Sequence, residues 1–108
     1  MTVYHVTFTQ HVRSIRATGL RLGQTHAIFA FKSREDAIRW AAKKDWEFCK
    51  NIGSGHISIL TLHTEADWAD YQNHARWLRQ FTPVKPDAIR HVEQFSGKLL
   101  AELRAITV

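Results

Sequence analysis

The feature that most constrains the fold is a run of six residues, 57–62 (ISILTL), which has the composition of a β-strand. Successive side chains of a strand point to opposite faces, so Ile57 and Ile59 share one face while Leu60 and Leu62 share the other. A strand that is apolar on both faces is covered on both sides, which predicts a place in the interior of a sheet. The rest of the chain must therefore supply neighbouring strands and covering elements.

The sequence predicts four further strands, two before and two after the central strand, and two helices before it. The strands are expected at residues 3–8, 27–31, 76–81 and 88–95, where β-branched and aromatic residues gather. The first helix carries Val12 and Ile15 on one face and ends near Gly19. The second begins after Ser33, whose hydroxyl can cap the first turn, and runs toward Cys49.

The remaining segments complete an α+β prediction. The polar stretch 64–74 is expected to hold a helical turn around Trp68, and Pro83 and Pro86 mark a turn before the next strand. Ser96 is expected to cap a last helix, which places four apolar residues on one face: Leu99, Leu100, Leu103 and Ile106. We therefore predict one domain over residues 1–108, with helices packed against a mostly antiparallel or mixed sheet.

Length and composition exclude several classes of protein. In these 108 residues no apolar run approaches the roughly 20 needed to span a bilayer, so no membrane association is expected. The N-terminal residues lack the pattern of a secretory signal, and a cytoplasmic location is the default expectation. The single cysteine excludes an internal disulfide framework and a cysteine-rich zinc module. The seven histidines show no metal-ligand spacing with a partnering acid, so no metal site is expected.

The charge balance favours anionic partners. The chain has 15 Lys and Arg against 10 Asp and Glu, a net charge of +5. Such a balance suits nucleic acid, a phosphorylated cofactor or an acidic protein. The basic residues are dispersed, with Arg21 grouped beside Arg13 and Arg16, so solvated surface charge is the alternative. The tryptophans are expected in the core and in cleft walls, and a base-stacking role beside basic residues is the other reading.

His5 lies in the first predicted strand, where position alone favours a structural histidine. The order of short motifs along the chain changes that interpretation. They are residues 4–7 (YHVT), 14–15 (SI), 19–20 (GL), 28–31 (IFAF), 36–41 (DAIRWA), 77–78 (WL) and 84–89 (VKPDAI). This ordered set resembles small members of the ADP-ribosyltransferase superfamily, and it shares parts of its pattern with the RNA 2′-phosphotransferase and DNA-targeting toxin branches. The resemblance covers residues 3–92.

The resemblance implies a split sheet with an NAD-binding cleft between its halves. It assigns His5 to the ribose of the nicotinamide half, as a binding and catalytic residue. It assigns backbone contacts with nicotinamide to Val6, where the family usually has glycine, and places Thr7 in the same pocket. Phe29 or Phe31 would stack on nicotinamide. Ser33 matches a family serine at the pocket, although capping of the second helix is the alternative.

The sequence departs from the family at the residue that stabilises positive charge on the ribose. The family usually places a glutamate at or just before the strand that corresponds to residues 76–81, and this chain has none there. Gln80 is the neutral substitute, and it is our second predicted catalytic residue. Arg76 and Arg79 are candidates for contacts with phosphate, nucleic acid or a partner, because a guanidinium suits phosphate. They are expected on opposite faces of their strand.

Two hypotheses of function follow. The first is an ADP-ribosyltransferase-like enzyme that binds NAD and modifies a macromolecular acceptor, either protein or nucleic acid. The second is a non-catalytic binder with the same fold, such as a phage or mobile-element inhibitor of a bacterial CRISPR-type nucleoprotein complex. Val6 and the missing glutamate favour the second hypothesis. Phosphotransferase chemistry ranks lower, because that branch carries a further N-terminal domain.

Overall fold

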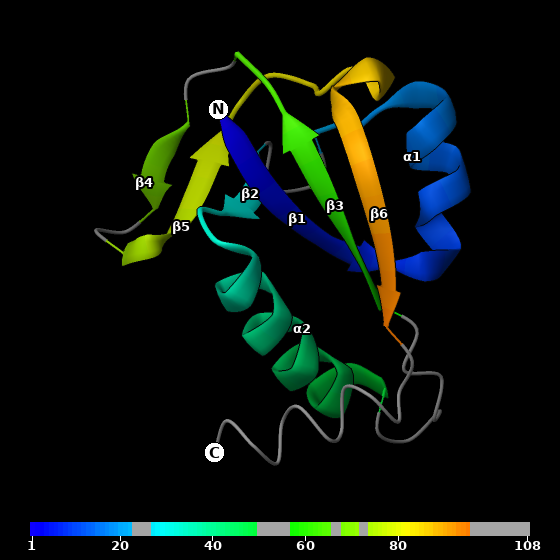
Figure 1. The fold of residues 1–108 in the computed structure, drawn as a ribbon, viewed down its shortest axis with the longest axis vertical. Helices are drawn as coiled ribbons and strands as arrows, with labels where there is room; N and C mark the ends of the chain where they lie inside the picture. Colours follow the sequence, from blue (N-terminus) through cyan, green and yellow to red (C-terminus); the bar gives the residue numbers. More distant parts are fainter. Residues whose placement is uncertain (23–26, 50–56, 66–67, 72–73, 96–108) are drawn as a thin grey trace.

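The structure is a computed structural model that describes residues 1–22, 27–49, 57–65, 68–71 and 74–95 (Figure 1). Its strands are β1 (Thr2–Phe8), β2 (Ile28–Phe31), β3 (Ile57–His63), β4 (Ala69–Tyr71), β5 (His74–Gln80) and β6 (Ile89–Phe95). Its α-helices are α1 (Val12–Thr18) and α2 (Arg34–Cys49), and two short 3-10 helices are η1 (Thr9–His11) and η2 (Pro86–Ala88). The predicted last helix, the break at 51–55 and part of the loop at 21–26 lie outside the described residues.

The described strands form one six-stranded antiparallel sheet in the order β4-β5-β2-β1-β3-β6. Strand β3 lies between β1 and β6, which confirms the interior position predicted from its apolar faces. Ile57, Ile59, Leu60 and Leu62 are each at most 1% exposed. The α+β class is therefore confirmed, and the sheet is antiparallel throughout the part of the chain described.

The sheet is covered on both faces by helices. On one face, the small residues Ala37, Ala41 and Ala42 of α2 pack against a cluster that includes Ile57 and Ile59. On the other face, Val12 and Ile15 of α1 pack against a second cluster, whose members include Val3, Leu60 and Leu62. In Figure 1 α1 lies beside β6, whereas α2 runs below the sheet from the end of β2.

Local chemistry explains where both helices begin or end. Gly19 follows α1 with φ 82°, a left-handed value that glycine tolerates best, and its N–H donates to the carbonyl of Ile15 at 2.7 Å. The Ser33 hydroxyl accepts a hydrogen bond from the Asp36 N–H at 3.1 Å, which caps α2 as predicted. Glu35 and Asp36 add negative charge to the first turn of α2, where the helix dipole favours it.

The helical turn predicted around Trp68 is wrong. The chain instead enters strand β4 at Ala69, which pairs with Arg79 of β5. Pairing with the edge of the sheet satisfies the backbone groups of this polar segment, and tertiary context outweighs local propensity there. The strand predicted to start at residue 88 starts at Ile89, because Pro86 begins the short helix η2.

An ion pair joins α2 to the edge strand β6, and it carries our first prediction. Arg34 donates two hydrogen bonds to the Glu93 carboxylate, each 2.6 Å long, and these bonds lower the pKa of Glu93. Because Arg34 is about half exposed, we expect a coupling energy of only ~0.5–1 kcal/mol from a double-mutant cycle of Arg34→Met and Glu93→Gln in urea. A lowered carboxylate pKa stabilises the fold above the ordinary glutamate pKa, so the coupling should decrease as the pH falls below about 4.3. A coupling near zero at pH 7 would show that the pair is not held in solution.

Candidate functional site

The sheet separates between β1 and β2. Strand β1 pairs with β3 at seven positions from Thr2 to Phe8, whereas it pairs with β2 at one position, Tyr4 with Phe31. Beyond that pair the two strands diverge, because β2 is held in register with β5 over its whole length. The division places β4, β5 and β2 in one half of the sheet, and β1, β3 and β6 in the other.

A hydrogen bond of the His5 side chain connects β1 to β2 across this opening. Nδ1 of His5 lies 2.7 Å from the carbonyl oxygen of Phe29, across the two diverging strands. A carbonyl oxygen only accepts, so Nδ1 carries the proton and donates it. Nε2 of the neutral ring is then an acceptor. The backbone of β2 therefore selects one tautomer of His5 and fixes the orientation of its ring.

A cavity of about 260 Å³ lies in the opening between β1 and β2. Residues of both strands line it, including His5, Val6, Phe29 and Phe31. Two tryptophans complete the wall, Trp40 from α2 and Trp77 from β5. Phe31 packs against both of them, with ring centroids 5.8 and 4.8 Å away, so the aromatic wall is one packed unit.

A second cavity, of about 530 Å³, adjoins the first and shares His5, Leu20 and Arg21 with it. Its other lining residues come from the end of β1, from η1 and from α1, and they include Thr7, His11, Ser14 and Thr18. Its wall combines these polar groups with the apolar side chains of Ile15 and Leu20. His5 and Arg21 therefore belong both to the aromatic cavity and to one that offers hydroxyl groups.

Burial lowers the pKa of His5 below its ordinary value, and the hydrogen bond to Phe29 opposes this only in part. The neutral ring is therefore favoured in the folded chain at pH 7. The cause is desolvation, which penalises the charged imidazolium. Among the described residues that line the two cavities there is no carboxylate to offset that penalty.

This lowered pKa predicts how stability depends on pH. As the pH falls below about 6.5, the unfolded chain binds a proton at residue 5 before the folded chain does, so the fold loses stability. The contribution of His5 is complete above that pH and decreases below it. We expect His5→Gln to flatten this part of the curve of unfolding free energy against pH, measured by urea denaturation. His91→Gln, at an exposed position of β6, is the matched control, because it removes an imidazole that lines neither cavity. An unchanged slope in His5→Gln would contradict the assignment.

The structure brings together most of the predicted binding residues. His5, Val6, Phe29 and Phe31 line the first cavity, and Thr7 lines the second. Ser33 is not among the lining residues. Its hydroxyl also donates to the Asp36 carboxylate at 2.9 Å, so both of its hydrogen-bonding roles serve the start of α2. The helix-capping alternative is therefore the one that the geometry supports.

The structure does not bring the two predicted catalytic residues together. Gln80 is 3% exposed and lines a separate cavity that has no residue in common with those at His5. Alternation along the strands places both side chains on the same face of the sheet, His5 with Val3 and Gln80 with Leu78, so their separation arises from their positions along that face.

Arg79 lies on the Trp77 face, opposite Phe29 in register, with its guanidinium carbon 5.2 Å from the centre of the Phe81 ring. It does not line either cavity at His5. Arg76 is placed in β5, and its side chain lies outside the described part of the structure.

Comparison with known proteins does not assign the chain to a family. No family model and no curated protein matches the chain. The candidate site therefore depends on its own geometry. None of the described helices is long and apolar enough to cross a membrane. The described residues also contain no group of three or more His, Cys, Asp and Glu side chains placed to hold a metal ion.

Sequence reasoning missed Arg21 as a site residue. It was grouped with Arg13 and Arg16 as dispersed charge, yet it lines both cavities at His5. One signal was present in the sequence, because Arg21 directly follows the Gly19-Leu20 pair that ends α1. The antiparallel bridge between Leu20 and Val84 fixes this segment beside the cavities, and that long-range contact is not visible in a local pattern.

Proposed function

We propose that this chain is an ADP-ribosyltransferase-like protein that binds NAD at His5 and transfers ADP-ribose to a macromolecule. One observation carries the proposal: His5 is fixed by the Phe29 carbonyl at the mouth of an aromatic cavity, between two diverging strands. The motif order along the chain implies a split sheet with NAD between its halves. The separation of β1 from β2 supports that expectation.

The size and chemistry of the cavities suit the two ends of NAD. A volume of about 260 Å³ is below the ~300–1,000 Å³ of most ligand pockets, so the aromatic cavity takes only the nicotinamide end. Phe29, Phe31, Trp40 and Trp77 offer flat apolar surface to that ring. The neighbouring cavity of about 530 Å³ offers Arg21 and hydroxyl groups to the phosphates. Nε2 of His5, an acceptor between them, is suited to a ribose hydroxyl.

In this proposal NAD supplies a ribose whose C1′–nitrogen bond breaks, so that nicotinamide leaves with the electron pair and the acceptor bonds to C1′ with loss of its proton. His5 orients the ribose, and the aromatic wall excludes water from the reacting carbon. Positive charge that develops on the ribose has no carboxylate beside it among the described lining residues. Aromatic faces are the groups available to stabilise it.

The test is binding and transfer measured on the whole chain. Isothermal calorimetry with NAD should give a one-to-one isotherm, and NAD should raise the melting temperature. A lysate incubated with the protein and NAD labelled on its adenine ring should retain label on a macromolecule. ATP serves as the control, because it shares the adenylate half and lacks nicotinamide. Absence of both the isotherm and the label would overturn the proposal.

A second function is favoured by the absence of an acidic residue from both cavities among the described residues, together with the separate position of Gln80. These observations suit a non-catalytic binder that keeps the fold, such as an inhibitor of a nucleoprotein defence complex. The net charge of +5 is compatible with such a target. The label experiment separates the two functions, because a binder transfers nothing.

A further inference from the structure

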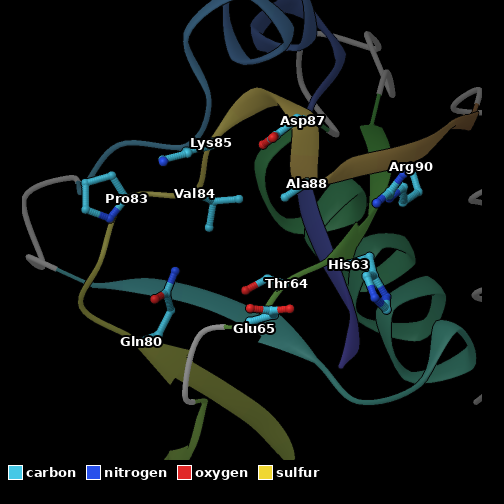
Figure 2. A pocket seen from close by; sticks show the side chains of 10 residues that line it. All are labelled: His63, Thr64, Glu65, Gln80, Pro83, Val84, Lys85, Asp87, Ala88 and Arg90. Atoms are coloured by element: carbon cyan, nitrogen blue, oxygen red, sulfur yellow. The ribbon is translucent and has the colours of Figure 1, made fainter.

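A third cavity lies away from the His5 site and is not used by the proposed function. It has a volume of about 450 Å³, and it is bounded by the ends of β3 and β5, the segment after β5 and the start of β6 (Figure 2). No lining residue is shared with the two cavities at His5. The function proposed for the His5 site therefore does not account for this cavity.

A buried amide with an unused donor reaches this cavity. Gln80 is 3% exposed, and its Oε1 accepts a hydrogen bond from the Thr82 N–H at 3.3 Å. That bond fixes which end of the amide is oxygen, because a flipped amide would place two donors together. Nε2 is buried and has no hydrogen-bond partner among the described residues. Figure 2 shows the side chain pointing from β5 into the space beneath residues 83–85.

A second buried donor lies close to Gln80 in the register of the sheet. The indole N–H of Trp68 also has no partner in the described part of the chain. Trp68 precedes Ala69, whose register partner Arg79 precedes Gln80, and it packs against the cluster that contains Leu78. A buried unpaired donor costs about 1–3 kcal/mol. Trp68 does not itself line the cavity, so Nε2 of Gln80 is the donor there, and the group that would satisfy it is an acceptor.

The charged groups around the cavity indicate that the acceptor belongs to a neutral molecule. Two exposed carboxylates, Glu65 and Asp87, and two exposed cations, Lys85 and Arg90, line the cavity. None of the four is in an ion pair with another described residue. An anion would meet the carboxylates and a cation would meet Lys85 and Arg90. Opposite charges in equal number therefore favour a ligand without net charge.

We propose that this cavity binds a neutral, nucleoside-sized molecule that places a carbonyl oxygen against Nε2 of Gln80. Pro83, Val84 and Ala88 supply apolar wall for a flat ring. The volume of about 450 Å³ falls in the lower half of the usual range of ~300–1,000 Å³, which suits a nucleoside better than a dinucleotide. The carbonyl belongs either to a nucleobase or to a carboxamide. The site does not depend on NAD binding at His5.

The test follows the Gln80 side chain directly by NMR. The whole ¹⁵N-labelled chain is titrated separately with uridine, inosine, adenosine and N-acetylglycinamide. Inosine and adenosine form a matched pair, because they differ in a carbonyl or an amine at one ring position. We expect uridine and inosine to shift the Gln80 side-chain NH₂ signal, with adenosine binding at least tenfold more weakly. N-acetylglycinamide tests the carboxamide as the source of the carbonyl.

Variants separate binding from folding. Gln80→Met keeps the length and removes the donor, and it should abolish the uridine-induced shifts of backbone signals at residues 84–88 that have an N–H. Gln94→Met, at an exposed position of β6 outside the cavity, is the matched control and should bind as the native chain does.

Three results would overturn the proposal. They are an unmoved Gln80 signal with every carbonyl compound, equal binding of adenosine and inosine, and unchanged uridine binding by Gln80→Met. The first would mean that water alone meets the buried donor. The readout on the native chain decides the question even where a variant does not fold.

Discussion

Gly19→Ala is expected to destabilise the fold by about 3 kcal/mol or more. Gly19 has φ 82° and ψ −175°, a region of backbone conformation that is essentially restricted to glycine and costs other residues about 1–3 kcal/mol. A Cβ placed there would also lie 2.0 Å from the carbonyl oxygen of Val84. That oxygen cannot move away easily, because it accepts the Leu20 N–H at 2.8 Å and the Val84 N–H donates back at 2.9 Å.

The measurement is urea denaturation of the native chain and the variant at pH 7. Against a typical stability of about 5–15 kcal/mol, the expected loss is large enough to leave a measurable unfolded fraction or to prevent folding. Thr18→Ala is the neighbouring control. It removes one exposed hydrogen bond, from the Thr18 hydroxyl to the Ser14 carbonyl, and it should cost about 0.5–1 kcal/mol. A loss below about 1 kcal/mol in Gly19→Ala would mean that the segments at 20 and 84 are not joined in solution.

The segment around Gly19 shows which features of this fold can be predicted from the sequence and which cannot. The end of α1 near Gly19 followed from a local rule, as did the cap of α2 at Ser33 and the interior position of the strand at 57–62. In each case the residues that decide the structure are neighbours in the chain. The approach of Val84 to Gly19 depends on a contact across 65 positions, and no pattern near either residue encodes it.

The same distinction applies to strand β4. The polar stretch 64–74 has no apolar alternation, so it gave no strand signal. Its residues 69–71 form a strand because the edge of β5 offers hydrogen-bond partners to Ala69 and Tyr71. The formation of β4 therefore depends on a tertiary contact with β5, which no local pattern in the sequence shows.

Most residues of the candidate site could be predicted from the sequence, but their arrangement in space could not. Motif order pointed to His5, Phe29 and Phe31, and all three line one cavity. Gln80 was selected because it stands in the strand where a glutamate was expected. Gln80 shares a face of the sheet with His5, but its register partner is Ile28 at the start of β2, and it lines a separate cavity. The register of β5 on β2 decides this outcome, and a single sequence does not contain the register.

His5→Ala is expected to weaken NAD binding at least about fivefold and to abolish transfer of ADP-ribose, if the proposed function holds. The substitution removes the Nε2 acceptor, and it leaves the Phe29 carbonyl without the donor that lies 2.7 Å away. The loss of one hydrogen bond in a part-buried site costs about 1–3 kcal/mol, which is at least a factor of about five in affinity. Loss of ribose orientation adds to the effect on transfer.

The experiment compares His5→Ala, His5→Asn and His91→Ala by calorimetry with NAD, by labelled transfer and by the melting temperature of each free protein. His5→Asn retains an amide donor for Phe29, so it separates the lost hydrogen bond within the protein from the lost contact with ribose. His91 is exposed on β6 and lines none of the described cavities, so His91→Ala should behave as the native chain does. A stoichiometric inhibitor that acts through its surface would keep its effect in His5→Ala. Retention of native NAD affinity by a folded His5→Ala protein would exclude His5 from the site, and the function would then have to be sought on the basic surface.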